Sequence, residues 1–254
     1  MSRLPTFQVF PAEPALAPWI RAARTKAAAA LSDPDLSHWW RAEKTWFVGV
    51  DALQNDAQGA VAGIRPEGRA IQAAHQIADL SWHPLQVSAV RPGYPGTGAQ
   101  DDPAGHRFRV TRDGAHLDGL LPVGPDRRRH LEEPHAYILG IALTQADADA
   151  SPLVVWDGSH KIIRDAFTAA FAGCAPKDWA RVDVTDVYKA ARRRVFETCP
   201  RRTVPLVPGQ AVLVHRMAIH GVAPWADSAN ADPLGRVIAY LRPRADPLWW
   251  LTVN

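Results

Sequence analysis

The stretch PGQAVLVHRMAIHG, residues 208–221, carries the pattern that decides the fold. After a Pro-Gly turn signal, the apolar run Ala211–Val214 is typical of a buried strand, and a second short strand is predicted at Ala218–Val222. His215 and His220 are five positions apart, so on one continuous strand their side chains face opposite sides. We therefore expect only His220 to reach a ligand site, with His215 in the core or beside the site.

Further short runs on either side of this stretch predict a strand-rich core with helices outside it. Strands are expected at Leu85–Val90, His106–Thr111, Ala136–Leu143, Leu153–Trp156 and Arg236–Leu241. Helical spacing of apolar residues predicts helices at Pro14–Leu31, Pro66–Leu80, Lys161–Ala172 and Val184–Thr198. Many short strands separated by Gly/Pro turns indicate a β-sandwich or barrel decorated by helices.

Composition excludes several classes of protein. The chain has 254 residues, 47% of them hydrophobic, which is enough for a substantial core and excludes dominant disorder. It shows no apolar run of membrane-spanning length, and its first residues lack the apolar segment of a signal peptide. With two cysteines no disulfide framework is expected, which fits a cytoplasmic protein. A net charge of +3 does not by itself imply nucleic acid.

The triplet His116-Leu117-Asp118 is the strongest candidate for metal ligation. On an extended strand, positions i and i+2 point to the same face, and a third histidine would complete the two-histidine, one-carboxylate set that holds non-haem iron. Chance alone gives about 0.8 such triplets in a chain of this composition, so context must decide. The rival His130-Leu131-Glu132 follows three arginines that oppose a dication, and we interpret it as a solvated loop. His116 follows a predicted strand and precedes Gly119.

These segments together resemble the phytanoyl-CoA dioxygenase-like branch of the iron(II)/2-oxoglutarate-dependent dioxygenases. The similar segments are VRPGYPG (90–96), HLDG (116–119), PLVVWDGSHK (152–161) and the stretch 208–221, in the family's order. In PLVVWDGSHK, Trp-Asp stands where the family usually has Val-Pro before its Gly-Ser-His-Lys. The resemblance covers the central and C-terminal two-thirds of the chain.

The resemblance implies a single dioxygenase domain, 1–254, with a double-stranded β-helix (jelly-roll, cupin-like) core. Residues 1–84 would form a mostly helical part packed on that core, and 85–254 the jelly roll, with a helical insert at about 159–198. It further implies that His116, Asp118 and His220 hold iron(II). Because a carboxylate is retained at Asp118, hydroxylation is expected rather than halogenation.

The resemblance also assigns the cosubstrate site. Arg236, sixteen residues after His220 on a predicted strand, would bind the far carboxylate of 2-oxoglutarate, which a guanidinium grips bidentately. Thr144 would add a hydroxyl bond, and Arg242, which shares a strand face with Arg236, is the fallback anchor. The reaction would then use dioxygen, convert 2-oxoglutarate to succinate with decarboxylation, and oxidise a small organic substrate.

Some alternatives stay open at this stage. A cupin-type metal-binding isomerase or a ligand-binding protein without oxygenase activity would share the metal ligands. The arginine runs 127–129 and 192–194 would suit a phosphate-bearing substrate, or simply be exposed faces. Ser159 is expected to cap the following helix. We expect no nucleic-acid partner and no membrane association, and the sequence leaves the oligomeric state unknown.

Overall fold

The computed structural model describes residues 4–98 and 102–253. Its α-helices are α1 (Ala17–Ser32), α2 (Arg69–Ile77), α3 (Pro103–Arg112), α4 (Ser159–Ala170), α5 (Thr185–Thr198) and α6 (Pro247–Thr252). Its strands are β1 (Phe7–Phe10), β2 (Trp40–Arg41), β3 (Trp46–Phe47), β4 (Gln86–Val90), β5 (Leu120–Val123), β6 (Arg128–Leu131), β7 (Tyr137–Ala142), β8 (Leu153–Trp156), β9 (Arg201–Val204), β10 (Ala211–His215), β11 (His220–Val222) and β12 (Arg236–Leu241). Short 3-10 helices lie at Pro14–Leu16, Pro34–Trp39 and Pro176–Arg181.

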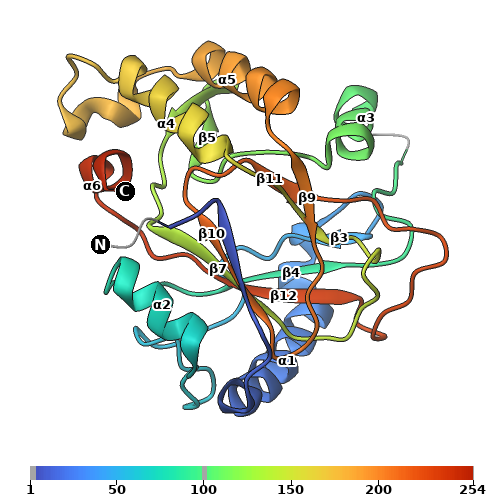
Figure 1. Cartoon of the computed structure of the whole chain (residues 1–254). Coiled ribbons are helices and arrows are strands. Elements are labelled where there is room, and N and C mark those ends of the chain that lie inside the picture. Colours follow the sequence, from blue (N-terminus) through green and yellow to red (C-terminus); the bar gives the residue numbers. More distant parts are fainter. Residues whose placement is uncertain (1–3, 99–101, 254) are drawn as a thin grey trace.

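Two antiparallel sheets form the core (Figure 1). The larger has the order β1-β10-β7-β12-β4-β3-β2 and the smaller β11-β8-β9, which His116 extends through an isolated bridge to His220. From β4 onward the chain alternates between the two sheets, except that β8 and β9 share the smaller sheet and that β5 and β6 form a separate two-stranded sheet. In this way β4, β7, β10 and β12 of the larger sheet alternate with the His116 segment, β8, β9 and β11 of the smaller one, which is the arrangement of a jelly roll. The predicted double-stranded β-helix core is therefore confirmed.

Apolar side chains fill the space between the sheets. From the larger sheet, Ile138, Val212 and Ile238 point inward and meet Leu153 and Val155 of the smaller sheet. This alternation follows from the two-residue period of a strand, which sends neighbouring side chains to opposite faces. It leaves positions 236, 238, 240 and 242 of the β12 segment on the inner face.

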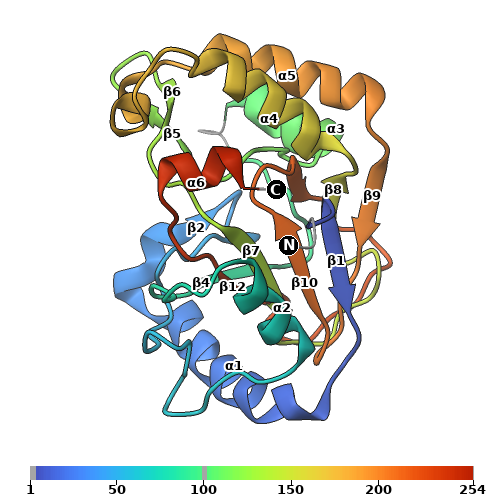
Figure 2. The same cartoon turned by 60° about the vertical axis from the view of Figure 1, so that its left-hand side comes forward.

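Helices cover the outer faces (Figure 2). α1 and α2 pack on the outer face of the larger sheet, where Trp19 and Ala74 join Leu139 and Leu213 in one buried cluster. α4, α5 and α6 cover the smaller sheet through a second cluster that includes Ile163, Phe167 and Trp250. Within residues 4–98 and 102–253, no helix combines the length and apolar character needed to cross a bilayer.

The prediction of a strand at His106–Thr111 is wrong, since these residues lie in α3. Asp102 caps this helix by accepting from the N–H groups of Ala104 and Gly105, and Pro103 occupies its first turn. The helix ends at Asp113, which adopts a left-handed φ of 55°. These local signals outweigh the polar/apolar alternation of HRFRVT. The sequence also predicts a short polar loop at 101–106. Residue 101 lies outside the described residues, and 103–106 form the first turn of α3.

Three smaller predictions also fail. Helix α2 begins at Arg69, three residues after Pro66. His130 lies in strand β6 and not in a solvated loop, because the segment pairs with β5. The N-cap of α4 is Gly158, while the buried hydroxyl of Ser159 accepts from the Ile219 N–H at 2.9 Å. Ser159 therefore ties α4 to the segment that leads into β11.

His215 and His220 are five positions apart, and a bend of the chain between them places the two residues in different sheets. Arg216 and Met217 form a turn, so His215 ends β10 in the larger sheet while His220 begins β11 in the smaller one. His215 then lies in the core, where its Nδ1 accepts from the Met217 N–H. His220 faces the space between the sheets.

Candidate metal centre

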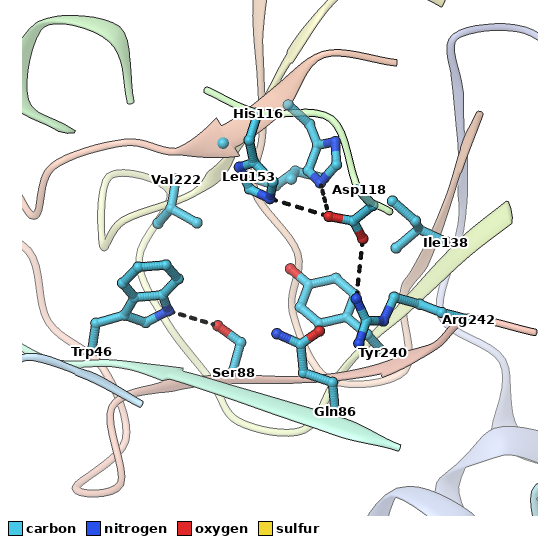
Figure 3. Close-up of a pocket in the computed structure, with 12 residues that line it drawn as sticks. Trp46, Gln86, Ser88, His116, Asp118, Ile138, Leu153, Val222, Tyr240 and Arg242 are labelled. Atoms are coloured by element: carbon cyan, nitrogen blue, oxygen red, sulfur yellow. Dashed lines mark hydrogen bonds and ion pairs between the residues drawn. The ribbon is translucent and has the colours of Figure 1, made fainter. Parts of the chain in front are cut away.

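Three side chains with metal-ligand chemistry converge beside one pocket, where His116 and Asp118 point toward each other in Figure 3. The ligand atoms of His116, Asp118 and His220 all lie within 4.8 Å of one another. Oδ1 of Asp118 is 3.2 Å from Nε2 of His116 and 3.6 Å from Nε2 of His220. Neighbouring ligands about 2.1 Å from one metal would be about 3 Å apart, so a small shift would bring these atoms onto a common ion.

Backbone pairing explains why the three meet. His116 and His220 are direct partners in an antiparallel bridge, with N–H···O distances of 2.8 and 3.1 Å in the two directions. Their rings lie 4.6 Å apart on the same face. Asp118 is two residues further along the extended segment, which returns its side chain to that face.

Both histidine rings are oriented by backbone carbonyls. Nδ1 of His116 lies 3.1 Å from the Gly114 carbonyl oxygen, and Nδ1 of His220 lies 3.0 Å from that of Ala218. A carbonyl oxygen can only accept, so each Nδ1 carries a proton. The Nε2 lone pair of His220 is then available to a metal, whereas Nε2 of His116 donates to Oδ1 of Asp118 and would release that proton to bind a metal. Such bonds fix the ring tautomer at many metal sites.

The local electrostatics favours the ligand forms of the acid and the distal histidine. Burial would raise the pKa of Asp118, but the hydrogen bond from His116 and the nearby His220 and Arg242 hold that pKa well below its usual range. Burial, together with the neighbouring His116, lowers the pKa of His220 to about 4. Near neutral pH the site therefore presents an anionic carboxylate and a neutral imidazole from His220.

Arg242 contacts the carboxylate from the other side. Its Nη1 donates to Oδ2 of Asp118 at 3.3 Å, and its side chain is 9% exposed. Oδ1, the oxygen nearest both histidines, is left for a metal. Because Arg242 already binds Asp118, it is a poorer candidate for binding the carboxylate of a cosubstrate.

Arg236 begins β12, six residues before Arg242, and has a different environment. It is 5% exposed, and within the described residues its Nη1 has no hydrogen-bond partner. No carboxylate among those residues forms an ion pair with it. It does not itself line the pocket beside the triad, but it pairs with Val90, which pairs with the pocket residue Trp46. A buried cation without an anion is costly unless a ligand supplies one.

Thr144 lies beside Arg236, but its hydroxyl bonds to the backbone on either side of that arginine. Its buried hydroxyl donates to the Gly235 carbonyl and accepts from the Val237 N–H, both at 2.8 Å. The two bonds flank Arg236 and fix the start of β12. A direct bond from Thr144 to 2-oxoglutarate stays a prediction, since its only hydroxyl hydrogen points at Gly235 in this structure.

Sequence reasoning did not single out Gln86, Ser88 or Tyr240 as part of the pocket wall. Beside the triad the pocket is lined by Trp46, Gln86, Ser88 and Tyr240, from β3, β4 and β12. Trp46 donates its indole N–H to Ser88 at 3.3 Å. The alternation of polar residues on β4, at 86 and 88, is the one sequence signal that marks this inner face.

The remaining candidate histidines lie elsewhere. His160 and His215 have their rings 4.6 Å apart, and Nδ1 of His160 lies 3.0 Å from the Thr6 hydroxyl. Neither residue belongs to the cluster of ligand atoms. The carboxyl terminus of β10 and the start of α4 therefore form a polar contact separate from the metal centre.

Comparisons with known proteins give distant structural likenesses. No protein-family model and no curated protein matches the chain. The non-heme alpha ketoglutarate dependent carbocyclase SnoK from nogalamycin biosynthesis is 14% identical, over 94% of this chain and 80% of that one, with a TM-score of 0.49. EctD from S. alaskensis, solved with 2-oxoglutarate and 5-hydroxyectoine, is 15% identical over 99% and 80%, also at 0.49. The non-heme alpha ketoglutarate dependent epimerase SnoN is 13% identical over 94% and 77%, at 0.45.

Proposed function

We propose that the chain is a non-haem iron(II)- and 2-oxoglutarate-dependent oxygenase of the phytanoyl-CoA dioxygenase-like kind that hydroxylates a small organic molecule. The observation that carries this proposal is the joint presence of the His116-Asp118-His220 cluster and of buried Arg236 on the inner face of the larger sheet, whose Nη1 has no hydrogen-bond partner and which has no ion-pair partner among the described residues. Two imidazoles and one carboxylate on one face suit iron(II) and leave the opposite positions open.

Each group of residues at the site would have its own role in binding. His116, Asp118 and His220 would hold the metal, with the two Nδ1 bonds and the Arg242 contact fixing their orientation. Arg236 would receive the far carboxylate of 2-oxoglutarate, which relieves the cost of its unpaired burial. Trp46, Gln86, Ser88 and Tyr240 would line the space left for the cosubstrate and the substrate.

Iron(II) bound with 2-oxoglutarate and dioxygen supplies an oxidant able to remove hydrogen from a C–H bond, with succinate and carbon dioxide as coproducts. The apolar wall of the same pocket, Ile138, Leu153 and Val222, would keep bulk water from the reacting atoms. This wall suits a substrate that presents an aliphatic carbon to the metal.

The proposal is tested by separating metal binding from cosubstrate binding. Calorimetric titration with Mn(II), an inert stand-in for iron(II), should show one site that is lost in His116→Ala. Titration of the metal-loaded protein with 2-oxoglutarate should show binding that weakens at least tenfold in Arg236→Ala, about 1.4 kcal/mol. Arg244→Ala is the matched control, because Arg244 follows the same strand but is exposed and paired with Glu133.

Turnover completes the test. Iron-loaded protein given 2-oxoglutarate in air should form succinate, slowly without substrate, and His116→Ala should form none. Metal binding without any 2-oxoglutarate binding, together with an Arg236→Ala variant that behaves like wild type, would instead indicate a cupin-type isomerase or a binding protein.

A further inference from the structure

A second cavity lies on the outer side of the smaller sheet, away from the pocket of the metal centre. It is enclosed by the β5–β6 hairpin and the first half of α5, which lie side by side in Figure 2 and are in contact. Its volume is about 210 Å³, many times what one water needs. It shares no lining residue with the pocket beside the triad.

The wall of this cavity is strongly basic. Three consecutive arginines, Arg127–Arg129, line it from the hairpin, and Lys189 and Arg192 line it from the helix. Thr185, Tyr188, Lys189 and Arg192 follow the i, i+3, i+4, i+7 spacing that places them on one helix face. Only one acidic residue, Asp126, is among the lining residues described.

Most of this charge is not neutralised by neighbouring acids. Arg128 is the exception, since it forms ion pairs with Asp183 at 2.5 Å and Asp186 at 3.0 Å. Arg127, Arg129, Lys189 and Arg192 form no ion pair among the described residues. Four unpaired cations facing one concave space repel each other, and a bound anion would relieve that repulsion.

Two of these arginines are held in place. Nη1 of Arg129 donates to the Leu120 carbonyl at 3.2 Å, and its backbone N–H donates to the Thr185 hydroxyl at 2.6 Å. Nη1 of Arg192 donates to the Ala115 carbonyl at 3.3 Å, and its guanidinium lies over the rings of Phe108 and Tyr188. A guanidinium fixed at one nitrogen keeps donors for a ligand and loses less entropy when it binds.

From this geometry we propose that the cavity binds a small, soluble phosphate-bearing anion. Phosphate oxygens accept several charge-assisted hydrogen bonds, and arginine forks match them bidentately. The hydroxyl of Thr185 donates to Asp183 at 2.6 Å and accepts from the Arg129 N–H, so it fixes the wall and does not itself bind the anion. The site lies behind the ligand segment Ala115–Leu117, so its anion is separate from the cosubstrate and the substrate of the metal centre.

The test measures binding of inorganic pyrophosphate to metal-free protein by calorimetry, at constant ionic strength because exposed charges are screened by salt. The variant Arg127→Gln/Lys189→Gln removes two cations from opposite walls, and both side chains are exposed, so the fold is preserved. The control Arg193→Gln/Arg65→Gln makes the same change in net charge at exposed residues that do not line the cavity.

We expect saturable binding of one pyrophosphate by wild type and by the control. The cavity variant should bind about tenfold or more weakly, as the loss of charge-assisted contacts implies. Absence of saturable binding in wild type, or an equal loss in both variants, would overturn the proposal. Cosedimentation with phosphatidic acid vesicles but no pyrophosphate binding would also overturn it, in favour of a lipid headgroup.

Discussion

Arg242 binds the oxygen of Asp118 that faces away from the two histidines: Nη1 lies 3.3 Å from Oδ2, while Oδ1 lies 3.2 Å from His116 Nε2. The two oxygens of the carboxylate therefore have different partners before any metal is present. This arrangement presets Asp118 as a ligand through one oxygen. It also places a cation next to the proposed metal site, where the carboxylate between them would offset the repulsion.

Removing this contact should weaken metal binding. In Arg242→Gln, Oδ2 loses a charge-assisted bond, the carboxylate gains freedom to rotate, and Mn(II) affinity should fall about 10- to 100-fold. Arg242→Lys should restore part of the Mn(II) affinity, because an ammonium keeps the positive charge but lacks the planar, two-donor geometry of a guanidinium. The measurement is calorimetric titration with Mn(II). An affinity equal to or higher than that of wild type would show that the repulsion outweighs the orientation.

Thr144 should matter for stability and for the neighbouring arginine. Thr144→Ala leaves the buried N–H of Val237 without its acceptor, which should cost about 1–3 kcal/mol in free energy of unfolding. Affinity for 2-oxoglutarate should fall as well, because the two bonds that flank Arg236 are lost. Thr144→Ser keeps the hydroxyl and should stay close to wild type in urea unfolding. If Thr144→Ser lost as much stability as Thr144→Ala, the methyl group and not the hydroxyl would be responsible.

Much of this fold could be predicted from the sequence because its strands are short and buried on both faces. The apolar runs of β7, β8, β10 and β12 are interrupted by turns that sequence alone marks. The His-x-Asp spacing likewise indicates that His116 and Asp118 point to the same face of an extended segment. The prediction failed at α3, which was expected to be a strand. The capping residue Asp102 indicates a helix there, whereas the alternation of polar and apolar residues that follows it indicates a strand.

The contacts that complete the site could not be predicted, because they join distant positions. Arg242 and Asp118 are 124 residues apart, and nothing in either local pattern specifies the pairing. Trp46 belongs to a strand of two residues, too short for a periodicity to show. The tertiary register of β3, β4 and β12 brings these residues together, and register depends on the whole sheet.

Acid should destabilise the protein through two buried histidines that are not candidate ligands. Burial, with the nearby Arg242, lowers the pKa of His135 to about 3, and burial, with Arg216, lowers that of His215 to about 2. In the unfolded chain both titrate near 6.5, so below that pH the unfolded state binds more protons than the folded state. Stability is complete above about pH 6.5 and falls as the pH drops toward about 3, by up to ~1.4 kcal/mol per pH unit for each histidine.

Urea unfolding of the metal-free protein at a series of pH values checks this slope. His135→Phe removes one titrating group from a site where both ring nitrogens lack partners among the described residues, so its slope should be shallower by up to one proton. His215→Asn keeps an acceptor for the Met217 N–H and should do the same. Equal slopes in wild type and both variants would mean that other groups dominate the acid response.

Gly221 should be intolerant of any side chain, because it follows His220 and packs directly against the backbone of Asp113 and Ala115. A Cβ built there would lie 2.2 Å from the Asp113 carbonyl oxygen, which already accepts from the Val222 N–H at 2.8 Å. Gly221→Ala must therefore move β11 away from the segment that carries His116, and the bridge between the two histidines would lengthen. We expect a loss of about 1–3 kcal/mol in free energy of unfolding and a larger proportional loss of Mn(II) affinity. Urea unfolding and calorimetric titration measure the two effects, and Mn(II) affinity unchanged in a folded Gly221→Ala variant would show that the ligand geometry does not depend on this packing.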